Sequence, residues 1–221
     1  MAGIKKTSTI KISTAIKACS ICLSCLIIFS VFANPFNNLT PKEQKRIEAW
    51  ENLLKKSKIK NELGILKKTN AFFNKLEFIA DTPMMSSADD WLTPYEFLIK
   101  GGGDCEDFAI AKYFTAKSLG ISKDKLRITY VIIKNRNQAH MILTYYPQPG
   151  AEPLILDNIN KTILPASKRP DLKPVYSFSI DDVWLQERMD KSSRYSDATS
   201  LSKWQALLKR FEEQSRLRNK Q

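Results

Sequence analysis

Two residues in the long C-terminal part of the chain are of types that catalyse reactions at carbonyl groups. Cys105 is the only cysteine after residue 33, and His140 is the only histidine in the 221 residues. A thiolate is a strong nucleophile, and an imidazole beside it can act as its general base. One cysteine and one histidine are too few for a zinc site, which takes three or four protein ligands. The pair therefore predicts nucleophilic thiol chemistry.

Asp157 is a candidate for the third member of such a site, because a general base needs an acceptor that orients its second ring nitrogen. Residues 139–146 and 154–157 read as strands that flank the turn Pro147-Gln148-Pro149-Gly150. An antiparallel hairpin centred in this turn places His140 directly opposite Asp157, with both side chains on one face. Taken singly, each residue also fits an ordinary structural role, as a buried spacer, a core histidine or a turn former.

The residues around Cys105 predict that its thiol stands at the start of a helix. Gly101-Gly102-Gly103 interrupts the chain, Asp104 is a typical N-cap residue, and Gly120 follows the expected helix over 104–119. The partial positive charge of a helix N-terminus lowers the pKa of a thiol and so favours the nucleophilic thiolate.

Three carboxylates, those of Asp104, Glu106 and Asp107, are close to this thiol in sequence. Negative neighbours raise the pKa of a thiol. At about 100° per residue, however, all three are expected to point away from the Cys105 side of the helix. Their oxygens suit a hard cation such as Ca²⁺, but Asp104 and Asp107 are equally suited to cap the helix without a metal. The spacing alone leaves both interpretations open.

Residues 34–100 are expected to form an N-terminal helical lobe. Thr40-Pro41-Lys42-Glu43 is a capping box with proline at the first helical position, so a helix begins there. Apolar residues at helical spacing predict a second helix over about 62–79. A polar loop over 81–90 then leads to Thr93-Pro94-Tyr95-Glu96, which starts a short third helix.

Residues 101–221 are expected to form the catalytic core. A strand over 126–133 pairs with the strand that carries His140, and the chain beyond Pro165 reads as irregular until a C-terminal helix. The helix is basic, in a chain of net charge +12. We expect its apolar stripe to close the core rather than attach to nucleic acid or a membrane. The stripe is formed by Leu201, Trp204, Leu208 and Phe211.

The first 33 residues have the pattern of a secretory signal peptide. Four lysines precede an apolar run over 18–32, and Val31-Phe32-Ala33 supplies small residues at the outer and final cleavage positions. This run is shorter than the roughly 20 residues that a membrane span needs. We expect cleavage after Ala33 and no stable membrane insertion afterwards. The alternatives are an uncleaved anchor and, less in keeping with the sequence, a lipoprotein signal at Cys25.

The local motifs around the candidate residues resemble those of the bacterial transglutaminase-like cysteine proteases of the LapG type. The matching segments are 91–97, 101–113 with Gly-Asp-Cys-Glu-Asp-Phe-Ala, and Gln138-Ala139-His140-Met141. The resemblance extends over essentially the whole chain after residue 33. It implies an α+β, papain-like or transglutaminase-like fold in which a helical lobe packs on an antiparallel sheet.

The resemblance also implies an activity. Cys105 would be the nucleophile, His140 the general base and Asp157 the orienting residue of a periplasmic, Ca²⁺-dependent endopeptidase. Such an enzyme cuts the N-terminal region of a large outer-membrane-retained adhesin, which releases the adhesin and promotes biofilm dispersal. The implied partner is the periplasmic domain of an inner-membrane receptor for cyclic di-GMP, which sequesters the protease. The expected metal ligands are Asp104, Glu106 and Asp107.

Two other functions remain open from the sequence. The same acyl-enzyme could pass its acyl group to an amine or hydrolyse an amide, as transglutaminases do, because the fold does not decide the acceptor. Alternatively, the protein could be a non-catalytic Ca²⁺-dependent binding module in which Cys105 is only a buried residue.

Overall fold

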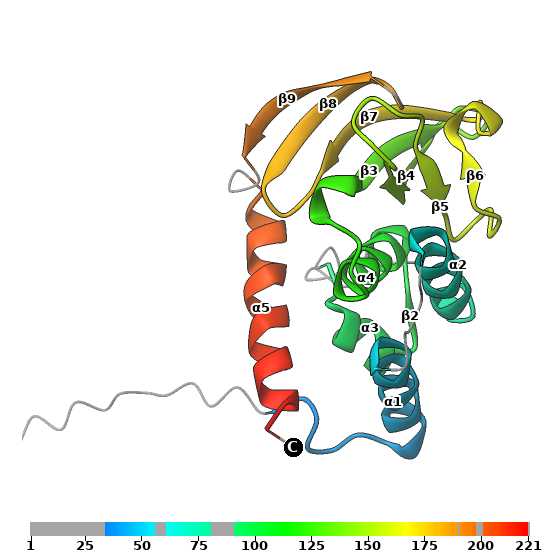
Figure 1. Cartoon of the computed structure of the whole chain (residues 1–221). Coiled ribbons are helices and arrows are strands. Elements are labelled where there is room, and N and C mark those ends of the chain that lie inside the picture. The colour runs from blue at the N-terminus through cyan, green and yellow to red at the C-terminus, as the bar shows by residue number, and fades with distance from the viewer. Residues whose placement is uncertain (1–33, 56–60, 81–90, 190, 198–200, 221) are drawn as a thin grey trace, which may run out of the picture. The chain divides into compact units, whose positions relative to one another are not determined.

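Helices and a large antiparallel sheet form the unit described by the computed structural model (Figure 1). Residues 34–221 make one compact unit, and the predicted α+β class is confirmed. The signal peptide over 1–33 and the loop over 81–90 lie outside the described residues, so both stay predictions. The structure describes residues 34–55, 61–80, 91–189, 191–197 and 201–220.

Two of the helices before Cys105 begin where the sequence predicted, and both begin with a capping box, of which the sequence pattern predicted only the first. In α1 (Pro41–Lys55), the backbone N–H of Thr40 donates to the Glu43 carboxylate at 2.7 Å. In α3 (Pro94–Lys100), Thr93 and Glu96 cap each other in the same way, and the helix ends at Gly101 in the left-handed region with φ 84°. Glycine adopts this conformation without steric cost, which explains why the helix ends there.

The prediction of a helix over about 62–79 is wrong at its C-terminal end, because α2 (Glu62–Phe73) is shorter. Asn74 is the C-cap residue, and its side-chain amide donates to the backbone carbonyl of Asp157 at 2.9 Å. The chain then becomes extended, and β1 (Glu77–Phe78) pairs in parallel with β2 (Gly102–Gly103). A tertiary contact therefore ends the helix although the apolar spacing continues.

The helix α4 (Cys105–Ser118) lies at the centre of the fold and begins where the sequence predicted. One side, with Phe108 and Ala111, packs into the cluster formed with α1 and α3. The other side, with Ile110 and Tyr113, packs against the sheet. A helix that is apolar all round is a buried one, so α4 is held from both sides. The division into lobes at residue 100 stays a prediction.

The large sheet has the strand order β6-β5-β4-β3-β7-β8-β9, and all its neighbouring strands are antiparallel. The predicted strands over 126–133 and 139–146 are confirmed to within one residue. Their face toward α4 carries the main core, and a second, smaller cluster of apolar residues lies on the opposite face. The strands are β3 (Leu126–Ile133), β4 (Gln138–Tyr145), β5 (Leu154–Leu156), β6 (Leu164–Pro165), β7 (Leu172–Phe178), β8 (Asp182–Arg188) and β9 (Lys191–Asp197).

The prediction of irregular structure between Pro165 and Leu201 is wrong, because β7, β8 and β9 extend the sheet there. The strand β7 contains Pro174, which lies where its register against β3 shifts by one residue. Proline disrupts a ladder and is tolerated at such a bulge. The sequence of β9, Lys-Ser-Ser-Arg-Tyr-Ser-Asp, has no apolar alternation. This segment therefore forms a strand because it pairs with β8, and its sequence pattern alone does not predict one.

The C-terminal helix α5 (Ser202–Arg218) packs by its apolar stripe, as predicted. Trp204 is fully buried in the main core, and the ring of Phe211 lies 4.4 Å from that of Phe114 between centroids. Gln214 donates to Glu96 at 2.8 Å, which ties α5 to the helix before the cysteine. No helix within the described residues is both long enough and apolar enough to cross a bilayer.

Candidate active site

The glycines before Cys105 allow backbone and side chains to approach closely at the start of α4. A Cβ on Gly102 would lie 2.2 Å from the carbonyl oxygen of Glu77 in β1. A Cβ on Gly103 would lie 2.2 Å from Oδ2 of Asp107. Both distances are far shorter than any non-bonded contact, so the two positions require glycine as the backbone stands.

Asp107 organises the start of this helix from the inside. Its Oδ2 accepts the backbone N–H of Asp104 at 3.3 Å, and its Oδ1 accepts that of Leu92 at 2.8 Å. The residue is 3% exposed. Burial raises the pKa of its carboxyl to about 7, against the hydrogen bond from Leu92. Both oxygens are engaged by backbone donors, which is the capping role that the sequence left open.

The three predicted metal ligands do not converge on one point. Among the described residues, no three His, Cys, Asp or Glu side chains are grouped so that they could hold a metal ion. Asp107 faces inward to the cap, whereas Asp104 and Glu106 are only partly buried beside the thiol. Of the three carboxylates, those of Asp104 and Glu106 therefore fit a cation that approaches from the solvent side.

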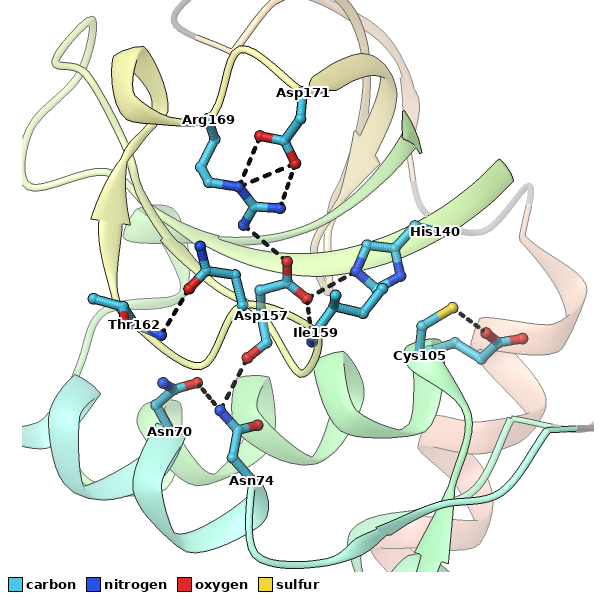
Figure 2. Close-up of polar contacts among 11 residues, drawn as sticks. Asn70, Asn74, Cys105, His140, Asp157, Ile159, Thr162, Arg169 and Asp171 are labelled. Atoms are coloured by element: carbon cyan, nitrogen blue, oxygen red, sulfur yellow. Dashed lines mark hydrogen bonds and ion pairs between the residues drawn. The ribbon is translucent and has the colours of Figure 1, made fainter. Parts of the chain in front are cut away.

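The thiol of Cys105 is surrounded by negative charge. Its Sγ donates to Oε2 of Glu106 at 3.1 Å (Figure 2). The expectation that all three carboxylates point away from the thiol is therefore wrong for Glu106, whose two methylene groups let it fold back. Burial, the Glu106 carboxylate and the Asp104 charge raise the pKa of Cys105, and a hydrogen bond with the backbone of Met141 acts in the opposite direction.

His140 and Asp157 meet, as the sequence predicted. Nε2 of His140 lies 2.8 Å from Oδ1 of Asp157, and their side chains are 3% and 0% exposed. The register differs from the predicted one, because Leu143 is opposite Leu156 and Asp157 lies just beyond the end of β5. The two side chains therefore meet diagonally, displaced by two residues. A displacement of two keeps both on the same face, which is why the prediction of their contact is correct.

The contact with Asp157 determines which imidazole nitrogen can serve the thiol. An ionised carboxylate only accepts hydrogen bonds, so Nε2 of His140 carries the proton and Nδ1 is left as an acceptor. Figure 2 shows the imidazole between Asp157 and Cys105. The backbone contact of Met141 with the thiol places the start of β4 against the start of α4. The three predicted residues thus come to one place from the start of α4, from β4 and from the segment just after β5.

Arg169 is part of this site, although no pattern in the sequence singles it out. Its Nη1 donates to Oδ2 of Asp157 at 2.8 Å. Burial alone would raise the pKa of Asp157. His140, the N–H of Ile159 and the Arg169 guanidinium together hold that pKa well below its usual range. A basic residue in a segment without periodicity carries no signal in a single sequence, so only the folded structure identifies it.

Lys112 is a second charged residue near the site that the sequence did not single out. It lies on α4, is 1% exposed, and its Nζ has no hydrogen-bond partner among the described residues. The Nζ lies 5.7 Å from the centre of the Phe108 ring. Burial lowers the pKa of Lys112 to about 7, and the negative charge of Asp157 partly opposes this.

Aromatic side chains pack into the same core cluster as Cys105. The rings of Tyr130 and Tyr176 stack at 5.1 Å with an interplanar angle of 7°. Trp91 and Phe178 stack in the same way at 5.4 Å. Partly buried Trp91, Tyr130 and Tyr176 contact the cluster that Cys105 also contacts. The core cluster that Cys105 contacts is thus also bordered by flat aromatic surfaces.

Comparison with known proteins agrees with this geometry. Residues 40–176 match the family described as bacterial transglutaminase-like cysteine proteinase BTLCP. The structure of Legionella pneumophila LapG is 48% identical, covers 78% of this chain and 91% of its own, and superposes with a TM-score of 0.70. Its EGTA-treated form gives the same values, and its calcium-bound form a TM-score of 0.69 with coverages of 77% and 92%. The curated proteins gave no match. The chain belongs to the bacterial transglutaminase-like cysteine proteinases and is a cysteine protease.

Proposed function

We propose that the protein is an endopeptidase in which Cys105, His140 and Asp157 form the catalytic triad. The observation that carries this proposal is the fully buried hydrogen bond of 2.8 Å between Nε2 of His140 and Oδ1 of Asp157. It orients the imidazole so that Nδ1 faces the side on which the thiol lies. A histidine with a merely structural role has no need of a buried carboxylate beside a helix-terminal cysteine.

The reaction follows from these positions. The Cys105 thiol passes its proton to Nδ1 of His140, and Sγ attacks the carbonyl carbon of the scissile peptide bond. The first N–H groups of α4 have no acceptor within the helix, so the N–H of Cys105 can stabilise the oxyanion. His140 then protonates the leaving amine, which yields a thioester on Cys105. Water, deprotonated by His140, hydrolyses the thioester and regenerates the thiol.

Calcium dependence is part of the proposal, with Asp104 and Glu106 as the side chains that would hold the ion. Both are carboxylates beside the thiol, and oxygen ligands of this kind suit Ca²⁺. Asp107 would support them from inside through the helix cap. A bound Ca²⁺ would neutralise the negative charge next to the nucleophile and draw Glu106 away from it. The existence of calcium-bound and EGTA-treated structures of Legionella pneumophila LapG, which is 48% identical, supports the proposed dependence on calcium.

The proposed substrate, partner and location follow the LapG-type proteases that the chain resembles. We place the protein in the periplasm, since residues 1–33 have the pattern of a cleaved signal peptide. Its substrate would be the N-terminal region of a large adhesin held in the outer membrane, and cleavage would release the adhesin and favour biofilm dispersal. Its partner would be the periplasmic domain of an inner-membrane receptor for cyclic di-GMP.

The decisive experiment mixes the purified exported protein with the outer-membrane fraction of its own cells, with Ca²⁺ and a labelled primary amine. We expect a released fragment with a new, unmodified N-terminus and no amine on the new C-terminus of the retained part. Cys105→Ala serves as the matched control and should release nothing. Amine incorporation would favour acyl transfer. Absence of any cleavage, together with a thiol that does not react with iodoacetamide, would favour the non-catalytic binding module.

A further inference from the structure

The hydrogen-bonded chain of the triad continues beyond Asp157. Nη1 of Arg169 donates to Oδ2 of Asp157 at 2.8 Å. The opposite edge of the guanidinium donates to the Asp171 carboxylate, from Nε at 3.0 Å and from Nη2 at 2.9 Å (Figure 2). Asp171, Arg169, Asp157 and His140 thus form one continuous line of polar contacts that leads toward the thiol.

The guanidinium lies in the interior, and the structure compensates its charge fully. The side chain of Arg169 is 5% exposed and that of Asp157 is 0% exposed, whereas that of Asp171 is 39% exposed. A buried ion pair contributes little net stability, because desolvation offsets the attraction of the charges. Stability alone therefore does not explain why this pair is buried. Its position beside His140 indicates a role in orienting the catalytic groups.

The loop that carries Arg169 has anchors of its own. Within the loop, the backbone N–H of Leu172 donates to the carbonyl of Arg169 at 3.2 Å. From outside the loop, the backbone N–H of Lys134 donates to the carbonyl of Asp171 at 2.8 Å. The side chain of Lys134 also donates to the carbonyl of Pro170 at 2.7 Å. These contacts fix the loop to the end of β3, so holding the loop does not require the guanidinium.

The guanidinium restricts rotation of the Asp157 carboxylate about its Cβ–Cγ bond. Oδ1 accepts from His140 and from the N–H of Ile159 at 2.9 Å, whereas Oδ2 accepts from Arg169. Arginine donors have a fixed planar geometry, so the contact at Oδ2 determines the plane of the carboxylate. Oδ1 then stays in line with Nε2 of the imidazole.

We propose that Arg169 is a positioning residue of this protease: it fixes the Asp157 carboxylate so that His140 keeps the tautomer with its proton on Nε2. This inference rests on the proposed triad. Arg169 does not touch the substrate or the thiol. It acts through Asp157, and Asp171 in turn holds the outer edge of the guanidinium. Without Arg169 the carboxylate can turn, and Nδ1 is no longer reserved for the thiol proton.

Four variants test the proposal in the untagged exported protein. Arg169→Met removes the charge and the donors, and Arg169→Lys keeps the charge but loses the planar donor edge. Asp171→Asn weakens only the outer contact. Lys134→Met is the matched control, because it removes an anchor of the same loop without touching Arg169 or Asp157. The steady-state kcat and KM for a peptide substrate and the melting temperature are measured for each.

A second readout does not depend on proteolysis. The chain has one histidine, so ¹⁵N-labelled histidine gives an imidazole spectrum that belongs to His140 alone. We expect wild type, Asp171→Asn and Lys134→Met to show a proton held on Nε2. We expect Arg169→Met and Arg169→Lys to show a mixture of both tautomers, with kcat lower by about tenfold to a hundredfold and KM little changed.

The outcomes separate the possible roles. Wild-type kcat and a single tautomer in both Arg169 variants would overturn the proposal. The proposal would also be overturned if kcat fell as much in Lys134→Met as in Arg169→Lys, since Arg169 would then act only as a loop anchor. If Arg169→Met does not fold, Arg169→Lys alone decides between these results. A tautomer change in Arg169 variants of a protein that cleaves no peptide would refute the proposed function and leave the positioning role in place.

Discussion

The thiol of Cys105 donates a hydrogen bond to the Glu106 carboxylate at 3.1 Å, on the side of α4 where a nucleophile is expected. This contact keeps the proton on sulfur, because a negative neighbour disfavours the thiolate. A cation bound to Glu106 would neutralise this negative charge and so favour the nucleophilic thiolate. Calcium is the cation that we propose.

The first prediction concerns this effect of the cation. Ca²⁺ should raise the rate at which iodoacetamide alkylates wild-type Cys105 at neutral pH, and EGTA should reverse the effect. Ca²⁺ should also raise the melting temperature, since a ligand that binds only the folded state stabilises it. Mg²⁺ should substitute poorly because it demands strict octahedral geometry. Thiol labelling followed by mass spectrometry and a thermal melt provide the measurements.

Glu106→Gln is the variant that distinguishes this scheme from simple helix capping. We expect its thiol to react faster than that of the wild type in EGTA, because one negative charge is gone, and to gain little from added Ca²⁺. Asp181→Asn is the control, as Asp181 is an exposed acid that pairs with Lys123. A Ca²⁺ response of Glu106→Gln equal to that of the wild type would remove Glu106 from the metal site.

The second prediction concerns the triad as a unit. Cys105→Ala and His140→Ala should each lower kcat/KM for peptide cleavage by about 10³-fold or more, and the double variant should be no worse than the poorer single one. Asp157→Asn should lose activity while keeping the size of the side chain, because the imidazole then loses its charged acceptor. Kinetics on one peptide substrate measure all four variants. Losses that multiply in the double variant would contradict a shared mechanism.

Sequence patterns predicted those features of the site that depend on neighbouring residues in the chain. The position of Cys105 at a helix start follows from the glycine run and the N-cap residue, which act within a few residues. His140 and Asp157 lie on the same face of the sheet because side chains alternate between the two faces with a period of two residues. A shift of the strand register by two residues leaves both side chains on that face. The register itself depends on the conformation of the Pro/Gly turn, which composition does not fix, and the prediction missed it by two residues.

The remaining features depend on contacts between distant segments. Arg169, in the segment before β7, reaches Asp157, which lies just after β5, and no spacing in the sequence signals this contact. The end of α2 at Phe73 depends on the contact of Asn74 with the backbone of Asp157. The orientation of Glu106 toward Cys105 is a choice of rotamer, which residue spacing around a helix does not determine.

The third prediction uses the glycine before the N-cap. In Gly103→Ala, the new methyl group would collide with the Asp107 carboxylate. We expect this to break the cap and to cost about 1–3 kcal/mol of unfolding free energy. Slower alkylation of Cys105 in Ca²⁺ should accompany this loss of stability.

Gly150→Asn is the control, since a Cβ there meets no atom within 4 Å and asparagine tolerates its φ of 76°. Urea denaturation gives the comparison, and a Gly103→Ala variant as stable as the wild type would show that the helix start can shift freely.

The last prediction concerns Lys112, whose burial lowers its pKa from the ordinary value of 10.5 to about 7. Between these two pH values the unfolded chain binds a proton at this lysine that the folded protein does not. Stability therefore rises with pH across the window from about 7 to 10.5. The cost of burying the ammonium is fully present below about pH 7 and is absent above 10.5.

Lys112→Met removes this cost. The variant should be more stable than the wild type at pH 6 to 7, by about 1–4 kcal/mol, and the advantage should shrink as the pH approaches 10. Urea denaturation at pH 6, 7, 8.5 and 10 measures both curves. Lys123→Met is the control, because Lys123 is exposed and paired with Asp181. If the free energies of unfolding of Lys112→Met and wild type change in parallel with pH, the folded protein keeps Lys112 protonated, and a buried water or the Asp157 charge compensates the ammonium.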